Sequence, residues 1–181
     1  MIDQWRIDST WSLFLDRDGV INERNWDGYI LDFKDFIFKP NVIESLKFLT
    51  NFFSHTIIIT NQQCVSKNLI SVSELDEIHH QMLHEINANG GEITGIYAAT
   101  EEKDKTPFRR KPNKTMGIEA QNQFPAIDFT KSIMVGDTDS DIQFGKNLGM
   151  KTILLKSAEI NSIKADLEIS NLTELVDYLM K

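Results

Sequence analysis

Short apolar runs recur along the chain and are separated by longer amphipathic stretches. Several of these runs are rich in β-branched residues, and their apolarity is continuous rather than alternating. Continuous apolar runs are typical of strands that are covered on both faces, as in a parallel sheet. We therefore predict strands at residues 11–15, 55–60, 96–99, 132–135 and 151–155, with a weaker one at residues 165–169.

The amphipathic stretches carry apolar residues three or four positions apart, which is the spacing of one helix face. The two clearest faces consist of Val42, Leu46, Leu49 and Phe53, and of Leu75, Ile78, Met82 and Ile86. We expect the second helix to have Ser73 as its N-cap and to end at Gly90. Further helices are predicted at residues 115–124, 139–148 and 172–180. Because strands and helices alternate, the chain is predicted to form an α/β domain around a mainly parallel sheet.

Two stretches do not follow this alternation. Residues 20–39, directly after the first predicted strand, are long and aromatic, and we expect them to form a hairpin or flap. Residues 101–114 are polar and charged, and we expect a loop. No repeat, linker or insertion long enough for a separate cap is visible, so residues 1–181 are predicted to form one domain without a large cap. The flap and the loop would then control access to a site.

Composition narrows the class of protein. Hydrophobic residues make up 41% of the 181 residues and charged residues 25%, as in ordinary soluble globular domains. The formal net charge of −8 disfavours nucleic acid or an anionic membrane surface as a partner. With a single cysteine, Cys64, the chain cannot form an internal disulfide. It shows neither a signal-peptide pattern nor an apolar run of the ~20 residues that cross a bilayer, so we expect a cytoplasmic protein.

Polar residues follow four of the predicted strands, and the carboxyl ends of parallel strands meet at one edge of a sheet, where ligands bind. These residues are Asp16, Asp18 and Gly19; Thr60, Asn61 and Gln62; Arg110 and Lys111, after a loop; and Asp137, Asp139 and Asp141. Carboxylates bind hard divalent cations and can act as nucleophiles or proton carriers. A hydroxyl and backbone amides can hold phosphate oxygens, and a lysine can offset the charge of a transferred phosphoryl group. Together these residues supply the parts needed for phosphoryl transfer.

Simpler interpretations exist for some of these residues. Asp16 and Asp18 with a following glycine also occur in calcium loops, but the further oxygen ligands and the glutamate of an EF-hand are absent. His80 and His84 lie one helical turn apart, close to His79. No further ligand is apparent and the glutamate of a His-Glu-x-x-His motif is missing, so we favour a solvated helix face over a zinc site.

Three other features bear on the site. Cys64 lies close to the predicted phosphate-binding turn, where we expect a lowered thiol pKa. No histidine stands beside it in the sequence, and the aspartates already account for the chemistry. Trp26 lies in the flap, where it could touch a substrate. The short basic stretch at residues 109–111 fits an anionic substrate better than nucleic acid.

Four segments together resemble the haloacid dehalogenase (HAD) superfamily of phosphatases. They are residues 14–22 (Phe-Leu-Asp-Arg-Asp-Gly-Val-Ile-Asn), Thr60-Asn61-Gln62, Arg110-Lys111-Pro112 and residues 135–141 (Val-Gly-Asp-Thr-Asp-Ser-Asp). They are most similar to the group that contains D,D-heptose 1,7-bisphosphate phosphatase and histidinol-phosphate phosphatase. The resemblance covers residues 13–155 and implies a Rossmann-like HAD fold with helices on both faces of the sheet.

The resemblance implies a magnesium-dependent phosphatase that acts on a small phosphorylated metabolite through an aspartyl-phosphate. D-glycero-D-manno-heptose 1,7-bisphosphate, losing its 7-phosphate, is the expected substrate. Histidinol phosphate, a polynucleotide 3′-phosphate and a catalytically silent protein that binds a phosphorylated ligand are the alternatives. We expect no nucleic-acid or membrane partner, and we expect a monomer.

The resemblance also implies roles in catalysis. Asp16 would attack phosphorus, and Asp18 would protonate the leaving alcohol and then activate water. Magnesium would be held by Asp16, the backbone carbonyl of Asp18, and Asp137. Lys111 would stabilise the nucleophile and the transferred phosphoryl group, and Asp141 would orient Lys111 or nearby waters.

Further residues match substrate-binding positions of the relatives. They are Thr60, Asn61 and Gln62 for phosphate, Arg110 for gripping the substrate, and Asp27, Gly28 and Tyr29 after the first motif. The chain departs from the relatives in two places. Relatives often carry a zinc-binding loop of Cys and His before Arg-Lys-Pro, but residues 98–109 contain neither, so we expect no zinc. Gln63-Cys64 stands where relatives usually have Ser-Gly, and this extra bulk would either narrow the pocket or remove a phosphate contact.

Overall fold

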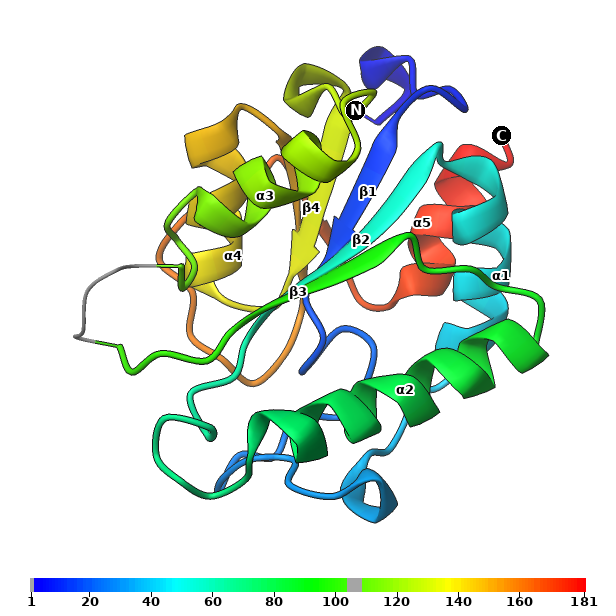
Figure 1. The fold of residues 1–181 in the computed structure, drawn as a ribbon. Helices are drawn as coiled ribbons and strands as arrows, with labels where there is room; N and C mark the ends of the chain where they lie inside the picture. The colour runs from blue at the N-terminus through cyan, green and yellow to red at the C-terminus, as the bar shows by residue number, and fades with distance from the viewer. Residues whose placement is uncertain (1, 104–108) are drawn as a thin grey trace.

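The fold is built around one twisted sheet (Figure 1). The computed structural model describes residues 2–103 and 109–181, and every pair of neighbouring strands in it is parallel. The strand order is β3-β2-β1-β4-β5-β6. The strands are β1 (Ser12–Leu15), β2 (His55–Asn61), β3 (Gly95–Ala99), β4 (Ser132–Gly136), β5 (Lys151–Leu155) and β6 (Leu167–Ile169).

Helices cover both faces of this sheet (Figure 1). They are α1 (Val42–Phe52), α2 (Val72–Ala88), α3 (Thr115–Gln123), α4 (Asp139–Leu148) and α5 (Leu172–Leu179), with 3-10 turns η1 (Ile2–Trp5), η2 (Phe33–Asp35) and η3 (Phe129–Lys131). The predicted α/β fold with a parallel sheet between two helical layers is therefore confirmed. Among the described residues, no helix is both long and apolar enough to span a membrane.

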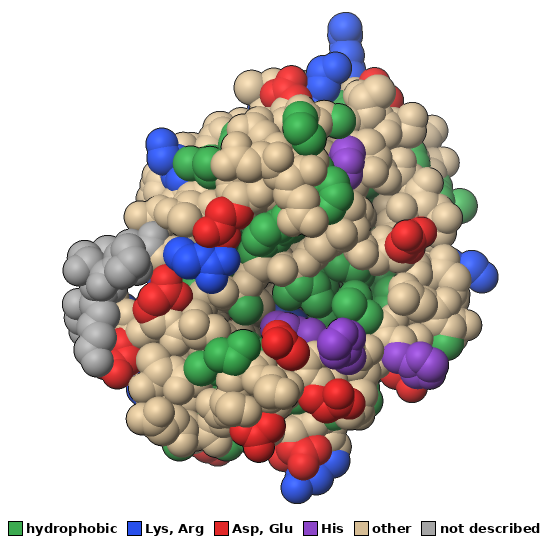
Figure 2. All heavy atoms as spheres, viewed as in Figure 1, with side chains coloured by type: hydrophobic (Ala, Val, Ile, Leu, Met, Phe, Trp, Pro, Cys, Tyr) green, Lys and Arg blue, Asp and Glu red, His purple; other side chains and the backbone are tan. Residues whose placement is uncertain are grey.

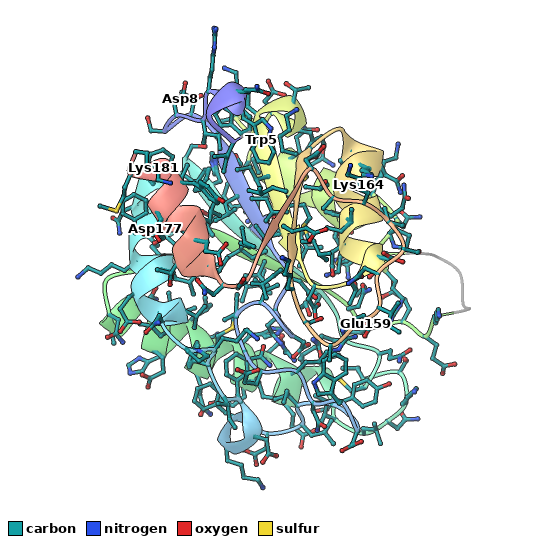
Figure 3. All side chains as sticks on the ribbon, turned by 180° about the vertical axis from the view of Figure 1, so that it is seen from behind. Trp5, Asp8, Glu159, Lys164, Asp177 and Lys181 are labelled. Carbon is teal, nitrogen blue, oxygen red and sulfur yellow. The ribbon has the colours of Figure 1, made fainter. Side chains whose placement is uncertain are left out.

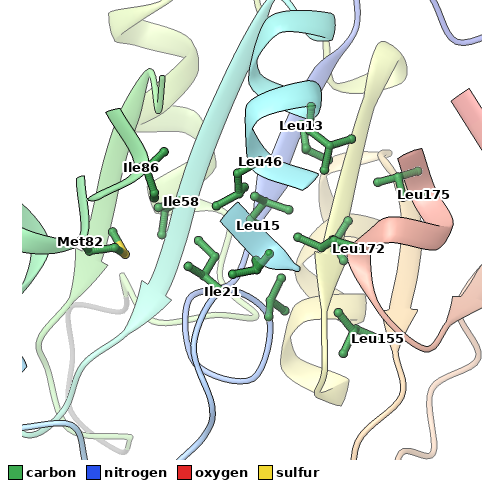
Figure 4. Close-up of a cluster of buried hydrophobic side chains, with 14 of the residues drawn as sticks. Leu13, Leu15, Ile21, Leu46, Ile58, Met82, Ile86, Leu155, Leu172 and Leu175 are labelled. Carbon is green, nitrogen blue, oxygen red and sulfur yellow. The ribbon is translucent and has the colours of Figure 1, made fainter. Parts of the chain in front are cut away.

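The two faces of the sheet carry separate hydrophobic cores, because successive side chains of a strand point to opposite faces. Leu13 and Leu15 face α1, α2 and α5, where they join Leu46 and Leu172 (Figure 4). Phe14 faces α3 and α4. Leu13, Phe14 and Leu15 are all fully buried. This double burial explains why the sequence of β1 reads as a continuous apolar run.

The connections of the sheet change direction beside β1, which makes this position a topological switch point. In β1, Leu15 pairs with Ile58 of β2 on one side and with Val135 of β4 on the other. The chain runs from β1 outward through β2 and β3, then returns to the other side of β1 through β4. Ligands of open α/β sheets bind beyond the carboxyl ends of the strands at such a point. The fold therefore places the residues that follow β1 and β4 in one crevice.

One predicted helix start is wrong by two residues. The N-cap of α2 is Ser71, not Ser73. The Ser71 hydroxyl accepts a hydrogen bond from the amide of Glu74, whose carboxylate accepts one from the Ser71 amide at 2.7 Å. This reciprocal capping box satisfies two free backbone donors, which Ser73 inside the first turn cannot do.

The two ends of residues 20–39, the flap, lie side by side. The Glu23 amide donates to the Ile37 carbonyl at 2.7 Å, and the Lys39 amide donates to the Ile21 carbonyl at 3.0 Å. These antiparallel contacts join the two ends of the flap, and its middle carries η2, which lies beside α2. The flap therefore lies beyond the carboxyl end of β1, beside α2 (Figure 1).

A buried polar contact joins α2 to the end of β1. The sequence predicts a solvated helix face for His79, but His79 is buried, whereas His80 and His84 are exposed. Histidine side chains are visible on the face of the molecule shown in Figure 2. The Arg17 Nη1 lies 3.1 Å from the His79 Nε2. Because arginine only donates hydrogen bonds, Nε2 is the acceptor and the imidazole is neutral. Burial, together with the charge of Arg17, lowers the pKa of His79 to about 3.

The tight contact between α4 and the sheet is testable. A Cβ on Gly145 would lie 2.7 Å from the Thr152 Cγ2 and 2.9 Å from the Met134 Cβ. We expect Gly145→Ala to lower the free energy of unfolding by about 1–3 kcal/mol, since overpacking forces neighbouring atoms to shift. Denaturant unfolding measures the change, with Lys146→Ala on the exposed side of α4 as the control. An unchanged free energy for Gly145→Ala would contradict this packing.

The buried neutral His79 makes stability depend on pH. The folded-state pKa of about 3 lies below the ordinary value of 6.5, so only the unfolded chain takes up this proton as the pH falls below 6.5. The contribution of His79 is thus complete at neutral pH and decreases toward pH 3. Between pH 7 and pH 5 we expect the wild type to lose about 2 kcal/mol of unfolding free energy more than His79→Gln. Parallel urea titrations of both proteins measure this difference, and equal losses would show that His79 is not held neutral.

Candidate active site

Two aspartates enter the crevice from adjacent strands. Asp16 follows β1, and its amide donates to the Val135 carbonyl of β4 at 2.9 Å. Asp137 follows β4 and is fully buried. Asp141 lies in the first turn of α4, where its Oδ2 accepts hydrogen bonds from the hydroxyl and the amide of Thr138, the N-cap, at 2.6 and 3.1 Å. Oxygens from the three carboxylates come within 4.8 Å of one another.

Two glycines make this crowding possible. A Cβ on Gly136 would lie 2.1 Å from the Asp141 Cβ. A Cβ on Gly19 would lie 2.2 Å from the Asp137 Oδ2, and the φ of Gly19 is +92°, which side chains rarely tolerate. Glycine at both positions lets two carboxylates approach the backbone where any side chain would displace them.

A buried lysine lies among these carboxylates. The Lys111 Nζ is 2.8 Å from the Asp16 Oδ1, 2.5 Å from the Asp141 Oδ1 and 2.7 Å from the Ile59 carbonyl oxygen. Its backbone is held from the end of β2, where the Asn61 Oδ1 accepts from the Lys111 amide at 2.9 Å. Burial opposes the charge on the ammonium, but Asp141 and Asp16 outweigh burial and raise the pKa of Lys111.

The cluster still carries unbalanced negative charge. Burial and the neighbouring carboxylates raise the pKa of Asp16 despite Lys111. Burial and Asp141 raise the pKa of Asp137 to about 6, although Arg24 opposes this shift. The Asp137 Oδ1 is buried and has no hydrogen-bond partner among the described residues. Buried carboxylate oxygens with an unmet demand for positive charge fit a hard divalent cation such as magnesium.

Asp18 lies in the opposite environment. Its carboxylate accepts hydrogen bonds from Arg17 at 2.9 and 3.0 Å, from the Asn22 Nδ2 at 2.9 Å and from the Gln62 Nε2 at 2.7 Å. Burial opposes ionisation, but the charge of Arg17 and these donors outweigh it and hold the pKa of Asp18 below its usual value. Its side chain is 25% exposed and faces the pocket. Burial and charge thus shift the pKa values of two aspartates one residue apart in opposite directions.

A pocket of about 850 Å³ opens above these residues. Of the sequence-predicted residues, Asp16, Asp18, Gly28, Tyr29, Asn61, Gln62, Arg110 and Lys111 line it. Four other predicted residues do not line it in the described part of the chain: Asp27, Thr60, Asp137 and Asp141. Thr60 is buried, and its hydroxyl accepts from the Gln62 Nε2 at 2.7 Å. Asp27 lies exposed in the flap, where its amide donates to the Asn25 Oδ1.

Two parts of the site were not predicted from the sequence: Arg24 and the loop after β5. Arg24 of the flap reaches the Asp137 Oδ2 at 3.2 Å and the Glu159 Oε2 at 3.4 Å. Residues 159–161 line the pocket from the loop after β5, where Figure 3 labels Glu159. The Asn161 Nδ2 donates to the Asp137 carbonyl at 3.1 Å. The rule that parallel strands end at one edge applies to β5 as well, so this loop was predictable.

The structure describes the predicted loop at residues 101–114 except for residues 104–108. Arg109 ties its end to the fold through Glu119 at 2.6 Å and the Ala98 carbonyl at 2.7 Å. The Arg110 Nη1 is buried without a hydrogen-bond partner among the described atoms, and Arg110 lines the pocket beside Lys103. Arg110 is therefore placed to meet an anionic ligand.

Cys64 does not behave as expected. Its side chain is fully buried, and burial raises the pKa of its thiol despite the nearby Arg17. The prediction of a lowered pKa is wrong because the thiol is buried, where it donates to the Gln62 Oε1 at 3.7 Å and does not line the pocket. Trp26 is 55% exposed, and the Arg24 guanidinium lies over its ring at 5.2 Å.

Comparison with known proteins places the chain in a family. Residues 108–179 match the HAD-hydrolase-like family model. D-glycero-alpha-D-manno-heptose-1,7-bisphosphate 7-phosphatase of Burkholderia mallei is 30% identical over 178 residues, covering 93% of each chain. D-glycero-beta-D-manno-heptose-1,7-bisphosphate 7-phosphatase of Helicobacter pylori is 27% identical and covers 93% of this chain and 96% of its own.

A solved structure has the same fold. D,D-heptose 1,7-bisphosphate phosphatase from B. bronchiseptica, in complex with magnesium and phosphate, superposes with a TM-score of 0.84. It is 22% identical, and the match covers 94% of this chain and 98% of that one. Given this fold and the identity to the B. mallei enzyme across nearly the whole of both chains, this chain belongs to the phosphatases of the HAD-like hydrolase family.

Proposed function

We propose that the protein is a magnesium-dependent phosphatase that removes the 7-phosphate of D-glycero-D-manno-heptose 1,7-bisphosphate through an aspartyl-phosphate. The observation that carries the chemistry is the buried cluster of Asp16, Asp137 and Asp141 around Lys111. The substrate comes from the names of the relatives, which include enzymes for the alpha and the beta anomer. The net charge of −8 supports a small metabolite rather than nucleic acid or a membrane as partner, and we propose a monomer.

In this proposal Asp16 is the nucleophile. Its Oδ1 accepts from the Arg17 amide at 2.7 Å and contacts the Lys111 ammonium at 2.8 Å. Two donors on one oxygen fix the plane of the carboxylate at the floor of the pocket, which favours in-line attack on phosphorus. The ammonium of Lys111 then offsets charge on the transferring phosphoryl group. Asp141 positions Lys111 from the other side.

Asp18 carries the proton. It is ionised before substrate binds, since Arg17, Asn22 and Gln62 donate to it. A phosphate dianion arriving beside Asp18 raises its pKa and favours the protonated form that donates to the leaving alcohol. The resulting carboxylate can then take a proton from the water that attacks the aspartyl-phosphate.

Magnesium would be held by Asp16, Asp137 and the backbone carbonyl of Asp18, and when bound it would neutralise charge on the phosphoryl oxygens. The unpartnered Asp137 Oδ1 supports this assignment. Arg110, Asn61, Gln62, Gly28 and Tyr29 would contact the substrate from the pocket wall. Thr60 would act indirectly. Its hydroxyl accepts a hydrogen bond from the side-chain amide of Gln62, and Gln62 lines the pocket.

The activity is tested by magnesium-dependent phosphate release from both anomers of heptose 1,7-bisphosphate, histidinol phosphate and a 3′-phosphorylated oligonucleotide. We expect release from one heptose anomer. Because Asp16→Asn removes the nucleophile, it should lower turnover by at least about a thousandfold. Release from histidinol phosphate alone would replace the substrate assignment. No release from any compound would favour a silent binding protein.

The metal assignment is tested separately. We expect Asp137→Asn to weaken magnesium binding by at least about tenfold, because it removes a ligand charge from the cluster. Calorimetric titration with magnesium measures the affinity without substrate. Asp128→Asn, an exposed aspartate that caps η3, is the matched control and should bind magnesium like the wild type. Equal affinity in both variants would exclude Asp137 as a ligand.

A further inference from the structure

The guanidinium of Arg17 connects the pocket to α2. It is completely buried, directly behind Asp18. Its Nε and Nη2 donate to the Asp18 carboxylate, with distances between 2.9 and 3.3 Å. Its remaining nitrogen, Nη1, donates to the His79 Nε2 at 3.1 Å. The ring of Phe36, from the flap, lies 5.8 Å from its centre.

This arrangement leaves Arg17 little freedom. The guanidinium is planar and its donors point in fixed directions, so holding Nη1 also fixes the edge formed by Nε and Nη2. Asn22 and Gln62 hold Asp18 from other directions, but only Arg17 holds both carboxylate oxygens in the described residues. The orientation of the carboxylate is therefore coupled to the contact between Arg17 and His79.

We propose that His79 is a positioning residue for Asp18, acting through Arg17, so that α2 sets the geometry of proton transfer to the leaving group. This inference rests on the proposed phosphatase activity, in which Asp18 is the proton carrier. His79 is 7% exposed and does not line the pocket, so it acts without touching the substrate. Without an acceptor at this position, Nη1 would be buried and unsatisfied, and Arg17 would turn toward other acceptors.

A positioning role makes a distinctive kinetic prediction. A sugar alcohol is a poor leaving group and needs a proton from Asp18 as the P–O bond breaks. The 4-nitrophenolate ion leaves readily without one. Since kcat/KM reports steps up to the first irreversible one, loss of Asp18 geometry should lower kcat/KM much more for the sugar phosphate than for 4-nitrophenyl phosphate. Loss of packing alone would lower both by the same factor.

The experiment compares His79→Leu, which has no acceptor, with His79→Gln, whose amide oxygen can accept from Arg17. For His79→Leu we expect kcat/KM for the sugar phosphate that the wild type turns over to fall about tenfold or more, and for 4-nitrophenyl phosphate to fall less than about threefold. His79→Gln should restore most of the loss. His84→Leu, on the exposed side of α2, is the matched control and should behave like the wild type.

A second variant keeps the test independent of the folding of His79→Leu. Arg17→Lys retains the charge but loses the fork, and it should show the same selective loss on the sugar phosphate. Equal losses on both substrates, or His79→Gln as impaired as His79→Leu, would overturn the proposal. An inactive wild type would instead overturn the proposed function and remove the basis of this inference.

Discussion

Three carboxylates buried around one ammonium are the constraint on which the rest of this structure depends. Removing charges from water costs several kcal/mol per ion, so a fold that buries Asp16, Asp137 and Asp141 must place positive charge among them. Lys111 supplies one cation through two short contacts, and Arg24 supplies a second at the edge of the cluster. The buried Asp137 Oδ1 still has no hydrogen-bond partner among the described residues. This unmet demand for positive charge fits the site for a divalent cation.

The close approach of these carboxylates constrains the backbone around them. Gly136 and Gly19 leave space that a side chain would fill, and each faces a carboxylate rather than an apolar side chain. Asp141 serves two purposes, because one oxygen caps α4 through Thr138 while the other contacts Lys111. The start of α4 is thus stabilised by the same carboxylate that positions the lysine. A helix, a strand end and a loop depend on one another here, which gives the site rigidity.

The two aspartates after β1 show how different environments shift the pKa values of identical side chains in opposite directions. Asp16 faces other carboxylates and its pKa is raised, whereas Asp18 faces Arg17, Asn22 and Gln62 and its pKa is lowered. A carboxylate is nucleophilic only when it is ionised, so the raised pKa of Asp16 opposes that role until a bound cation offsets the neighbouring negative charges. The donors around Asp18 are Arg17 after β1, Asn22 of the flap and Gln62 after β2, and Arg17 also donates to His79 of α2. Elements remote from the cluster of Asp16, Asp137 and Asp141 therefore set the environment of Asp18.

The sequence by itself determined the alternation of strands and helices and the edge at which Asp16, Asp18, Lys111 and Asp137 meet. The hydrophobic period is a local signal, and the carboxyl ends of parallel strands share one edge of the sheet. It could not place His79, since helical spacing does not say which polar residue is turned toward a buried partner such as Arg17. The raised pKa of Cys64, the inward hydroxyl of Thr60, and the contacts of Arg24 and Glu159 were likewise decided only in the tertiary structure. Each depends on contacts between segments far apart in the chain, and burial and charge at such contacts are properties of the packed molecule rather than of any local run of residues.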